Sequence, residues 1–324
     1  MKAAVVFQRG EMPTYVTNRE EPKVQNENEL LVSVKASAVK NLDKMRASGR
    51  HYSTEHEEWM PRIVGGDGVG VLGDGTRVYG IGVNGMIAEK AVIEKDRMVV
   101  LPNGIDDATA AALPNAVMGS ALAFRFRASL QKGDTVMING ATGVTGNVAV
   151  QIAKYYGAKK VIATGRNEQS LKELLSLGAD EIISLKQDDE TLVSQIRSIH
   201  LQHPVDIVID YLWGRSAELI LSVLKGNGGF SHRTRYVTVG GMMGDTITLS
   251  SSILRSTDIQ ISGSGLGSWT REEMKSLITE ILPEMFHLAA ERKLKIDTVN
   301  IPLKDIEMAW DMQLDSGKRL VVLI

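Results

Sequence analysis

The sequence predicts an α/β protein that combines a partly closed β domain with a doubly wound parallel sheet. Residues 1 to about 115 contain several short apolar runs separated by Gly, Pro, Asn and Asp turns, as in compact β domains. From residue 134 onward, runs of strand length alternate with helical segments, which is typical of a parallel sheet covered by helices. A turn of small residues joins the first strand and the first helix of this second region, and such a turn favours a bound nucleotide.

The composition excludes several classes of protein. The 324 residues are enough for two domains, and a hydrophobic content of 43% supports sizeable cores. A formal net charge of −2 gives no reason to expect nucleic acid or a membrane surface as a partner, and no apolar run approaches the ~18 residues that span a bilayer. The amino-terminal run predicts a strand and not an export signal, so we expect a cytoplasmic protein. Cysteine is absent, which removes disulfides, thiol nucleophiles and thiolate metal sites.

The first region is expected to consist mainly of strands. Residues 29–38 alternate in hydrophobicity as a half-buried strand does, and Gly73-Asp74-Gly75 is a hairpin signal. Acidic residues at Asp106 and Asp107 then open a helix, and a second helix is expected from about Ala116 to Ser129. The expected strands are Lys2–Phe7, Glu29–Ala38, Gly68–Leu72, Thr76–Gly80 and Met86–Ile93.

A strand, a turn and a helix follow one another from Thr135 to Tyr156. The residues of the strand, Thr135–Asn139, suit a buried parallel strand, and Gly157 is a natural stop for the helix Asn147–Tyr156. The turn between them is a dinucleotide fingerprint with Ala in the first glycine position. Its small residues let the backbone approach a pyrophosphate, and the helix start supplies positive potential. The alternative is a tight turn without a ligand. The expected cofactor-binding residues of the turn are Ala141, Thr142, Gly143, Val144, Thr145 and Gly146.

The end of the next strand, Val161–Ala163, indicates which nicotinamide cofactor is preferred. NAD-binding proteins usually place Asp or Glu there, whereas NADP-binding proteins leave the carboxylate out and place Arg nearby. This chain has Thr164-Gly165-Arg166-Asn167, in which Gly165 makes room and Arg166 offers a planar, permanently charged partner for a 2′-phosphate. NADP(H) is therefore the expected cofactor. A solvated arginine in a loop is the alternative interpretation of Arg166.

The alternation of helices and strands continues to residue 262. From Arg271 we expect a long helix, and then a strand, a short helix and a final strand that return to the first domain. The expected elements after Asn167 are helices at Gln169–Leu177, Glu190–Ile199, Ala217–Leu224 and Ile306–Leu314, and strands at Glu181–Ser184, Val205–Asp210, Arg235–Val239, Ile259–Ser262, Thr298–Leu303 and Arg319–Ile324.

Several segments, in order and spacing, carry a resemblance that covers essentially the whole chain. They include Ala36–Asp43, Pro61–Gly70, Gly140–Gly146 and the ending Gly317-Lys-Arg-Leu-Val-Val-Leu. On these segments the chain resembles the medium-chain dehydrogenase/reductase superfamily, in its zinc-independent quinone oxidoreductase-like branch. The resemblance implies a GroES-like, partly closed β-barrel domain (1–115 and 271–324), an inserted Rossmann domain that binds NADP(H) (116–270), and a cleft between them.

The chain departs from the zinc alcohol dehydrogenases of this superfamily at the metal ligands. Those enzymes use a Cys after the second strand and a Gly-His-Glu segment; here the matching stretches are Ala38-Val-Lys-Asn and Gly65-Gly66-Asp67. Zinc has no soft ligand at either place, so we expect no metal. His51 and His56 lie among glutamates, but their spacing fits neither a helical pair nor a finger motif, and a solvated loop is the simpler interpretation.

Without a metal, the expected reaction is hydride transfer to an acceptor that is already electron-poor, such as a quinone or an activated alkene. Catalysis would come mainly from positioning and from a donor to the developing oxyanion. The resemblance points to Lys40 near the cofactor ribose or nicotinamide and to Tyr52 in the acceptor pocket. Lys40 as an exposed cation at a strand end and Tyr52 as a core residue are the alternatives.

The resemblance also implies further cofactor contacts and a homodimer. Leu185 stands where relatives often stack an aromatic residue on adenine, and Gly241–Leu249 is a candidate edge strand for pairing between subunits. A cofactor-binding regulatory or structural protein on the same fold is the alternative function, since a fold does not fix a function. The further contacts implied by the resemblance are Ser120, Asn139, Gly240, Leu266 and Arg319.

Overall fold

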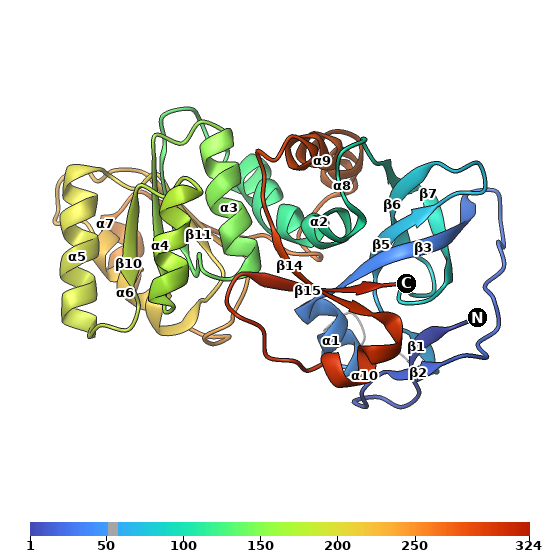
Figure 1. The fold of residues 1–324 in the computed structure, drawn as a ribbon. Coiled ribbons are helices and arrows are strands. Elements are labelled where there is room, and N and C mark those ends of the chain that lie inside the picture. Colours follow the sequence, from blue (N-terminus) through green and yellow to red (C-terminus); the bar gives the residue numbers. More distant parts are fainter. Residues whose placement is uncertain (51–57) are drawn as a thin grey trace. The chain divides into compact units, whose positions relative to one another are not determined.

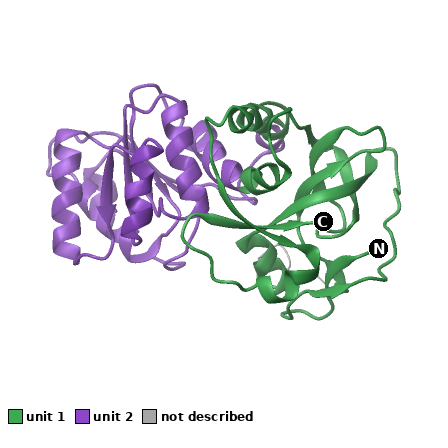
Figure 2. Cartoon of the chain, in the orientation of Figure 1, with its two compact units in different colours: residues 1–115, 275–324 green, residues 116–274 purple. Residues whose placement is uncertain are grey.

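The computed structural model describes residues 1–50 and 58–324. The chain forms two compact units, which Figure 2 colours separately: unit 1 comprises Met1–Asn115 and Lys275–Ile324, and unit 2 comprises Ala116–Met274. Tyr52, His51 and His56 lie outside the described residues. In the part of the chain that is described, no helix has the length and apolar character of a membrane span.

Unit 1 is built mainly on antiparallel strands, with one parallel pair, β14 and β15 (Figure 1). In its main sheet, β3 pairs with β5 and β7, and β6 pairs with both of these, so four strands close into a small ring. The short sheet has the order β2-β1-β4. The main sheet has the order β14 (Asp297–Pro302), β15 (Lys318–Leu323), β3 (Glu29–Val39), β5 (Asp67–Val71), β6 (Arg77–Gly82) and β7 (Lys90–Val100), and the short one is formed by β2 (Thr14–Val16), β1 (Ala3–Val6) and β4 (Arg62–Ile63).

Unit 2 is a six-stranded parallel sheet, as predicted. The strand order reverses at β8, which lies between β9 and β11. Because the crossover connections are right-handed, α3 and α4 lie on one face of the sheet and α5 and α6 on the other. The strand order is β10 (Glu181–Ser184), β9 (Lys160–Gly165), β8 (Thr135–Asn139), β11 (Ile207–Asp210), β12 (Thr234–Thr238) and β13 (Ile259–Gly263). The helices between the strands are α3 (Val144–Tyr155), α4 (Glu168–Ser176), α5 (Asp189–Gln202), α6 (Gly214–Leu224) and α7 (Ser251–Ser256).

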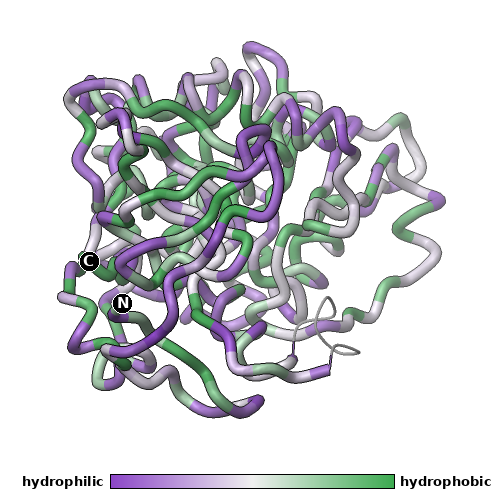
Figure 3. Tube along the Cα trace, turned by 90° about the vertical axis from the view of Figure 1, so that its right-hand side faces the viewer, coloured by the Kyte–Doolittle hydropathy of each residue, from purple (hydrophilic) through white to green (hydrophobic). Residues whose placement is uncertain are grey.

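The cores follow the hydropathy of the chain. All five residues of β8 and all four of β11 are buried, as expected for central parallel strands covered on both faces. Figure 3 shows hydrophobic stretches along many of the inner segments and hydrophilic ones in the outer loops. The remaining elements are α1 (Asn41–Ala47), α2 (Asp107–Leu122), the π-helices η1 (Ala123–Arg127) and η2 (Leu277–Ile281), α8 (Arg271–Ser276), α9 (Leu282–Ala290), the 3₁₀ turn η3 (Leu303–Asp305) and α10 (Ile306–Ala309).

Two local predictions were wrong. One helix, α2, runs through Pro114 and continues into η1, where two separate helices were expected. Its apolar residues are almost completely buried, and tertiary packing of this kind overrides the local cost of a proline. Residues 241–249 form no strand. Gly244 has a φ of +152°. This backbone conformation favours glycine and does not fit a regular β-strand.

Candidate functional site

A tight turn after β8 forms the first part of the candidate site. Gly140 has a φ of +89°, a conformation that favours glycine. A Cβ on Gly146 would lie 2.5 Å from the carbonyl oxygen of Gly140 and 2.6 Å from Cα of Ala141. Since both are backbone atoms, neither could move without displacing the turn. Gly146 therefore lets helix α3 begin directly against the end of β8, which is the role of the last small residue in a dinucleotide fingerprint.

The amino end of α3 can accept an anion. Its N-cap is Gly143, which provides no side-chain hydrogen bond to the first helical N–H groups. A Cβ on Gly143 would meet only the carbonyl oxygen of Gly140, at 3.7 Å, so the space beside the turn is open. Val144 and Thr145 begin the helix and are half-buried. Uncapped N–H groups together with the helix dipole form a site suited to phosphate.

A buried polar network supports this turn from below. Asn139 Nδ2 donates to Asp210 Oδ1 at 2.8 Å and to Ser216 Oγ at 2.9 Å. Asn139 Oδ1 accepts from Thr164 Oγ1 at 2.8 Å, and Thr164 Oγ1 accepts in turn from the backbone N–H of Gly140 at 3.2 Å. The side chains of Asn139 and Thr164, both expected cofactor contacts, are fully buried and are engaged within the protein. They hold the ends of β8 and β9 in register.

Asp210 is the centre of this network. Its Oδ1 also accepts from the backbone N–H groups of Leu212 at 2.8 Å and Trp213 at 3.0 Å, and its Oδ2 accepts from Tyr236 Oη at 2.6 Å. Trp213 has a φ of +58°, a strained conformation for a bulky residue, which these bonds stabilise. Burial, reinforced by the Asp210 carboxylate, holds the pKa of Tyr236 well above its usual value, so its hydroxyl remains a donor. Sequence reasoning missed Asp210, because a strand-ending Asp has no distinctive spacing.

The end of β9 packs against the same turn. A Cβ on Gly165 would lie 2.4 Å from Cγ2 of Thr142, so any larger residue here would force the Thr142 side chain to move. From the sequence, Gly165 is explained by the room that it leaves for a 2′-phosphate, whereas the structure explains it by the contact with Thr142. Arg166 is exposed. Asn167 is the N-cap of α4, and its Oδ1 accepts from the N–H of Ser170 at 3.0 Å.

Parallel strands bring most of the other predicted contacts to one edge of the sheet. Leu185, Gly240 and Leu266 follow the carboxyl ends of β10, β12 and β13, which is the edge where β8 enters the phosphate-binding turn. Leu185 and Gly240 are half-buried, and Leu266 is 38% exposed. Ser120 differs: it is fully buried within α2, and its hydroxyl donates to the carbonyl of Ala116 at 2.6 Å.

In unit 1, Lys40 is the centre of a buried ion cluster. Its side chain is only 3% exposed, and its ammonium contacts Asp67 Oδ1 closely and Asp43 Oδ2 at 3.2 Å. Tyr79 Oη donates to Asp67 Oδ2 at 2.8 Å. Asp43 also accepts from the backbone N–H groups of Lys40, at 2.9 Å, and Gly66, at 3.0 Å. The alternative prediction of an exposed Lys40 was therefore wrong.

The cluster keeps Lys40 charged. Burial alone would lower the pKa of Lys40, but Asp43 and Asp67 more than offset this, and the pKa is raised. Burial lowers the pKa of Arg319, against the opposing effect of the same two carboxylates. Arg319 Nη2 donates to Asn115 Oδ1 at 3.2 Å, while its buried Nε has no hydrogen-bond partner among the described residues. Two cations thus balance two carboxylates in this cluster.

Comparison with known proteins gives this geometry its context. Residues 144–282 match the family model of zinc-binding dehydrogenases. A probable NADPH-dependent quinone reductase of Emericella nidulans is 26% identical over 91% of this chain and 92% of its own. A chloroplastic NADPH-dependent alkenal/one oxidoreductase of Arabidopsis thaliana is 32% identical over 50% of this chain and 46% of its own. The quinone oxidoreductase of Thermus thermophilus, solved also with NADPH, superposes with a TM-score of 0.81 at 25% identity, over all of both chains.

The chain is therefore similar to quinone oxidoreductases over most of its length, which agrees with the resemblance to the quinone oxidoreductase-like branch of the medium-chain dehydrogenase/reductase superfamily. Within residues 1–50 and 58–324, the structure shows no group of three or more His, Cys, Asp or Glu side chains able to hold a metal ion. At the place where its zinc-dependent relatives have the Gly-His-Glu segment, this chain has Asp67, whose carboxylate is paired with an ammonium. Asp43 stands three residues after Lys40, a spacing that could have indicated the hydrogen bond from the backbone N–H of Lys40 to Asp43 at the start of α1. The participation of Asp67 and Tyr79 depends on pairing between strands, which the sequence does not reveal.

Proposed function

We propose that this protein is an NADPH-dependent enzyme that reduces a quinone or an activated alkene by hydride transfer, without a metal. The observation that carries the proposal is the open, uncapped amino end of α3, built on a turn that requires Gly146. The names of the relatives support an oxidoreductase of this kind. The proposed acceptor is a small molecule, since the relatives are named for quinones and alkenals.

The residues present fit the cofactor. The N–H groups at Val144 and Thr145 would receive the pyrophosphate, and Arg166 would pair with the 2′-phosphate. Gly143 leaves the approach open, because a side chain there would occupy the space beside these N–H groups. Asn139, Thr164 and Asp210 act indirectly by holding the turn. Arg319 stays a predicted cofactor contact.

When bound, NADPH would supply the hydride; the protein would supply position and charge. Lys40 is held by Asp43 and Asp67 and has a raised pKa, so we propose that it acts as a fixed positive charge and not as a proton donor. Quinones and enones accept hydride without strong polarisation, and positioning alone can supply a large part of the rate. We retain Tyr52, which lies outside the described residues, as a candidate for the acceptor pocket.

The test is an acceptor panel with both reduced cofactors. We expect NADPH oxidation with quinones or enones and much weaker use of NADH. Deuterium transfer from labelled NADPH to the β-carbon of an enone would indicate alkene reduction, and hydroquinone formation would indicate quinone reduction. Tight NADPH binding with no turnover on any acceptor would instead favour a cofactor-binding regulatory protein. Absence of NADPH binding in calorimetry, or stoichiometric zinc in the purified protein, would contradict the proposal.

We also propose that the protein forms a homodimer in the cytoplasm. The strand β13 pairs only with β12 among the described strands, so one edge of the parallel sheet is unpaired. An unpaired edge is a common place for strand addition. Light scattering at several concentrations would give the mass, and a monomer at all of them would contradict the dimer.

A further inference from the structure

The loop that connects β13 to α8 comprises residues 264–270 and contains glycine at positions 265 and 267, directly after Gly263 at the end of β13. Its internal hydrogen bonds join Gly265 to Ser268 and Ser264 to Trp269. A Cβ on Gly263 or Gly265 would meet no atom within 4 Å, so the space around these residues does not require glycine. A segment of this composition has much conformational freedom and loses it only when other groups hold it.

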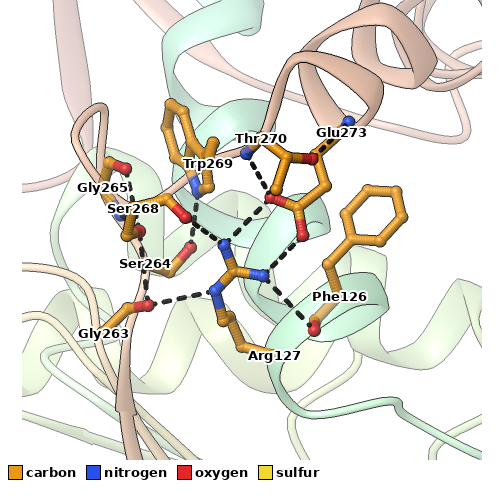
Figure 4. A network of polar contacts seen from close by, with 9 residues as sticks. All are labelled: Phe126, Arg127, Gly263, Ser264, Gly265, Ser268, Trp269, Thr270 and Glu273. Atoms are coloured by element: carbon orange, nitrogen blue, oxygen red, sulfur yellow. Dashed lines mark hydrogen bonds and ion pairs between the residues drawn. The ribbon is translucent and has the colours of Figure 1, made fainter.

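Arg127, at the end of the π-helix η1, holds this loop at both ends (Figure 4). Its Nε donates to the carbonyl of Gly263 at 3.2 Å, before the loop, and its Nη2 donates to the carbonyl of Ser268 at 2.6 Å, near the loop's end. Its two terminal nitrogens also form a bidentate pair with Glu273 on α8, at 2.6 and 2.9 Å. One planar guanidinium therefore fixes a strand end, a loop and a helix.

Contacts within the loop complete the arrangement in Figure 4. Glu273 Oε2 accepts from the N–H of Thr270 at 2.9 Å, and Thr270 Oγ1 accepts from the N–H of Glu273 at 3.1 Å. Trp269 Nε1 donates to Ser264 Oγ at 3.0 Å. The side chains of Arg127 and Glu273 are only 16% and 13% exposed. A bidentate pair shielded in this way is stronger than an exposed one.

The sheet order indicates which part of a dinucleotide this loop faces. The strand β9, which ends at Arg166, lies on one side of β8, and β11, β12 and β13 follow on the other side. At about 4.8 Å between strands, β13 is about 14 Å from β8 at the carboxyl edge. A dinucleotide with its pyrophosphate at α3 and its 2′-phosphate near Arg166 extends toward β13 with its nicotinamide half. Leu266 is in the loop at this position.

We propose that Arg127 is a positioning residue that fixes loop 264–270 against the nicotinamide half of the cofactor. This inference rests on the proposed function, because it requires NADPH on the carboxyl edge of unit 2. Arg127 would not touch the reacting atoms. It would act through the loop, so its loss should impair transfer to the acceptor far more than it impairs cofactor binding.

Unit 2 provides a matched control in Arg235. This arginine also pairs with a carboxylate, Asp134, at 2.9 Å and donates to three backbone carbonyls, those of Ala128, Ser129 and Asp206. Its side chain is 19% exposed, close to the value for Arg127. Arg235, however, lies near the amino end of β12, away from the carboxyl edge. Arg127→Gln and Arg235→Gln therefore remove similar interactions at opposite ends of the strands.

Steady-state kinetics and NADPH titration should separate the two variants. For Arg127→Gln we expect kcat/KM for the acceptor to fall about 10- to 100-fold, a loss typical of misplaced reactants, while the Kd for NADPH changes by no more than about threefold, because the phosphate contacts remain. Arg127→Lys keeps the positive charge but cannot form the bidentate pair, so its kcat/KM should lie between that of Arg127→Gln and that of the unmodified protein. Arg235→Gln should lower Tm comparably and leave kcat/KM within about twofold. Equal kinetic losses in both glutamine variants would overturn the proposal.

Amide hydrogen exchange distinguishes failure of this inference from failure of the proposed function. NADPH should protect both segment 140–146 and segment 264–270 in the unmodified protein, and only segment 140–146 in Arg127→Gln. Protection of segment 140–146 alone in the unmodified protein would overturn the role of Arg127 while preserving the NADPH site. No protection at either segment would contradict the proposed function, and with it this inference.

Discussion

Asn139 Nδ2 donates to Asp210 Oδ1 at 2.8 Å, which ties the carboxyl end of β8 to that of β11 directly beneath the phosphate-binding turn. The carboxylate receives four hydrogen bonds from neutral donors, two of them backbone N–H groups. The phosphate-binding turn is therefore supported by Asp210, a carboxylate that is fully buried. Substitution of Asp210 should weaken cofactor binding although its side chain does not contact the cofactor.

Asp210→Ala should destabilise the protein by about 3 kcal/mol or more, because it leaves several buried donors without an acceptor. The affinity for NADPH should fall as the turn loses its support. Urea unfolding and calorimetric titration would measure the two effects. Tyr236→Phe is the matched control: it removes one donor, leaves the other three bonds to Asp210, and should cost about 1 kcal/mol. Equal losses in the two variants would contradict the central role of Asp210.

Two glycines of the turn should respond differently to the same added methyl group. Gly146→Ala places a Cβ 2.5 Å from a backbone oxygen, so we expect a loss of about 1 to 3 kcal/mol in unfolding free energy together with weaker NADPH binding. Gly143→Ala meets no close atom and has a φ of −74°, so it should keep its stability and weaken NADPH binding only. Thermal unfolding and NADPH titration of both variants provide the check. Full NADPH affinity in Gly143→Ala would exclude the pyrophosphate from this position.

Arg166→Ala should raise the KM for NADPH about tenfold or more and leave that for NADH almost unchanged. The reason is that one charge-assisted contact to the 2′-phosphate is worth about 1.5 to 3 kcal/mol. Arg215→Ala is a suitable control, since Arg215 is an exposed arginine paired with Asp189 and Glu218. Initial rates at varied NADPH and NADH concentrations would give both KM values for each variant. Similar losses with NADPH and NADH would show that Arg166 has another role.

Lys40→Met should destabilise the protein by about 3 to 5 kcal/mol at neutral pH, because it leaves Asp43 and Asp67 buried without their cation. The pKa of Lys40 is raised above 10.5 in the folded state, so its contribution to stability is complete below pH 10.5 and is lost as the pH rises through the higher folded value. The unmodified protein should therefore lose stability at alkaline pH more steeply than the variant. Tm measured from pH 8 upward would show this, and parallel curves would contradict the assignment.

The fold was predictable where one local pattern determined the outcome. The strand Thr135–Asn139, the glycine turn and the alternation after it predicted a parallel sheet, and the sheet is present. The ion cluster was not predictable, because Lys40 and Asp67 are 27 residues apart in the chain and meet only through strand pairing. The assignment of NADP(H) contacts to Gly143, Arg166 and Leu266 stays a prediction. For Asn139 and Thr164 the structure shows a supporting position beneath the turn.

The contact between Gly165 and Thr142 limits how the coenzyme preference of this protein could be redesigned. Introducing Asp or Glu at position 165 is an obvious way to recruit a ribose hydroxyl, but its Cβ would displace Thr142 from the fingerprint turn. The affinity for NADPH and for NADH should therefore both fall, because Thr142 belongs to the turn that is proposed to bind either coenzyme. Residues 166 and 167, beyond the buried end of β9, are the better starting points for a design that favours NADH.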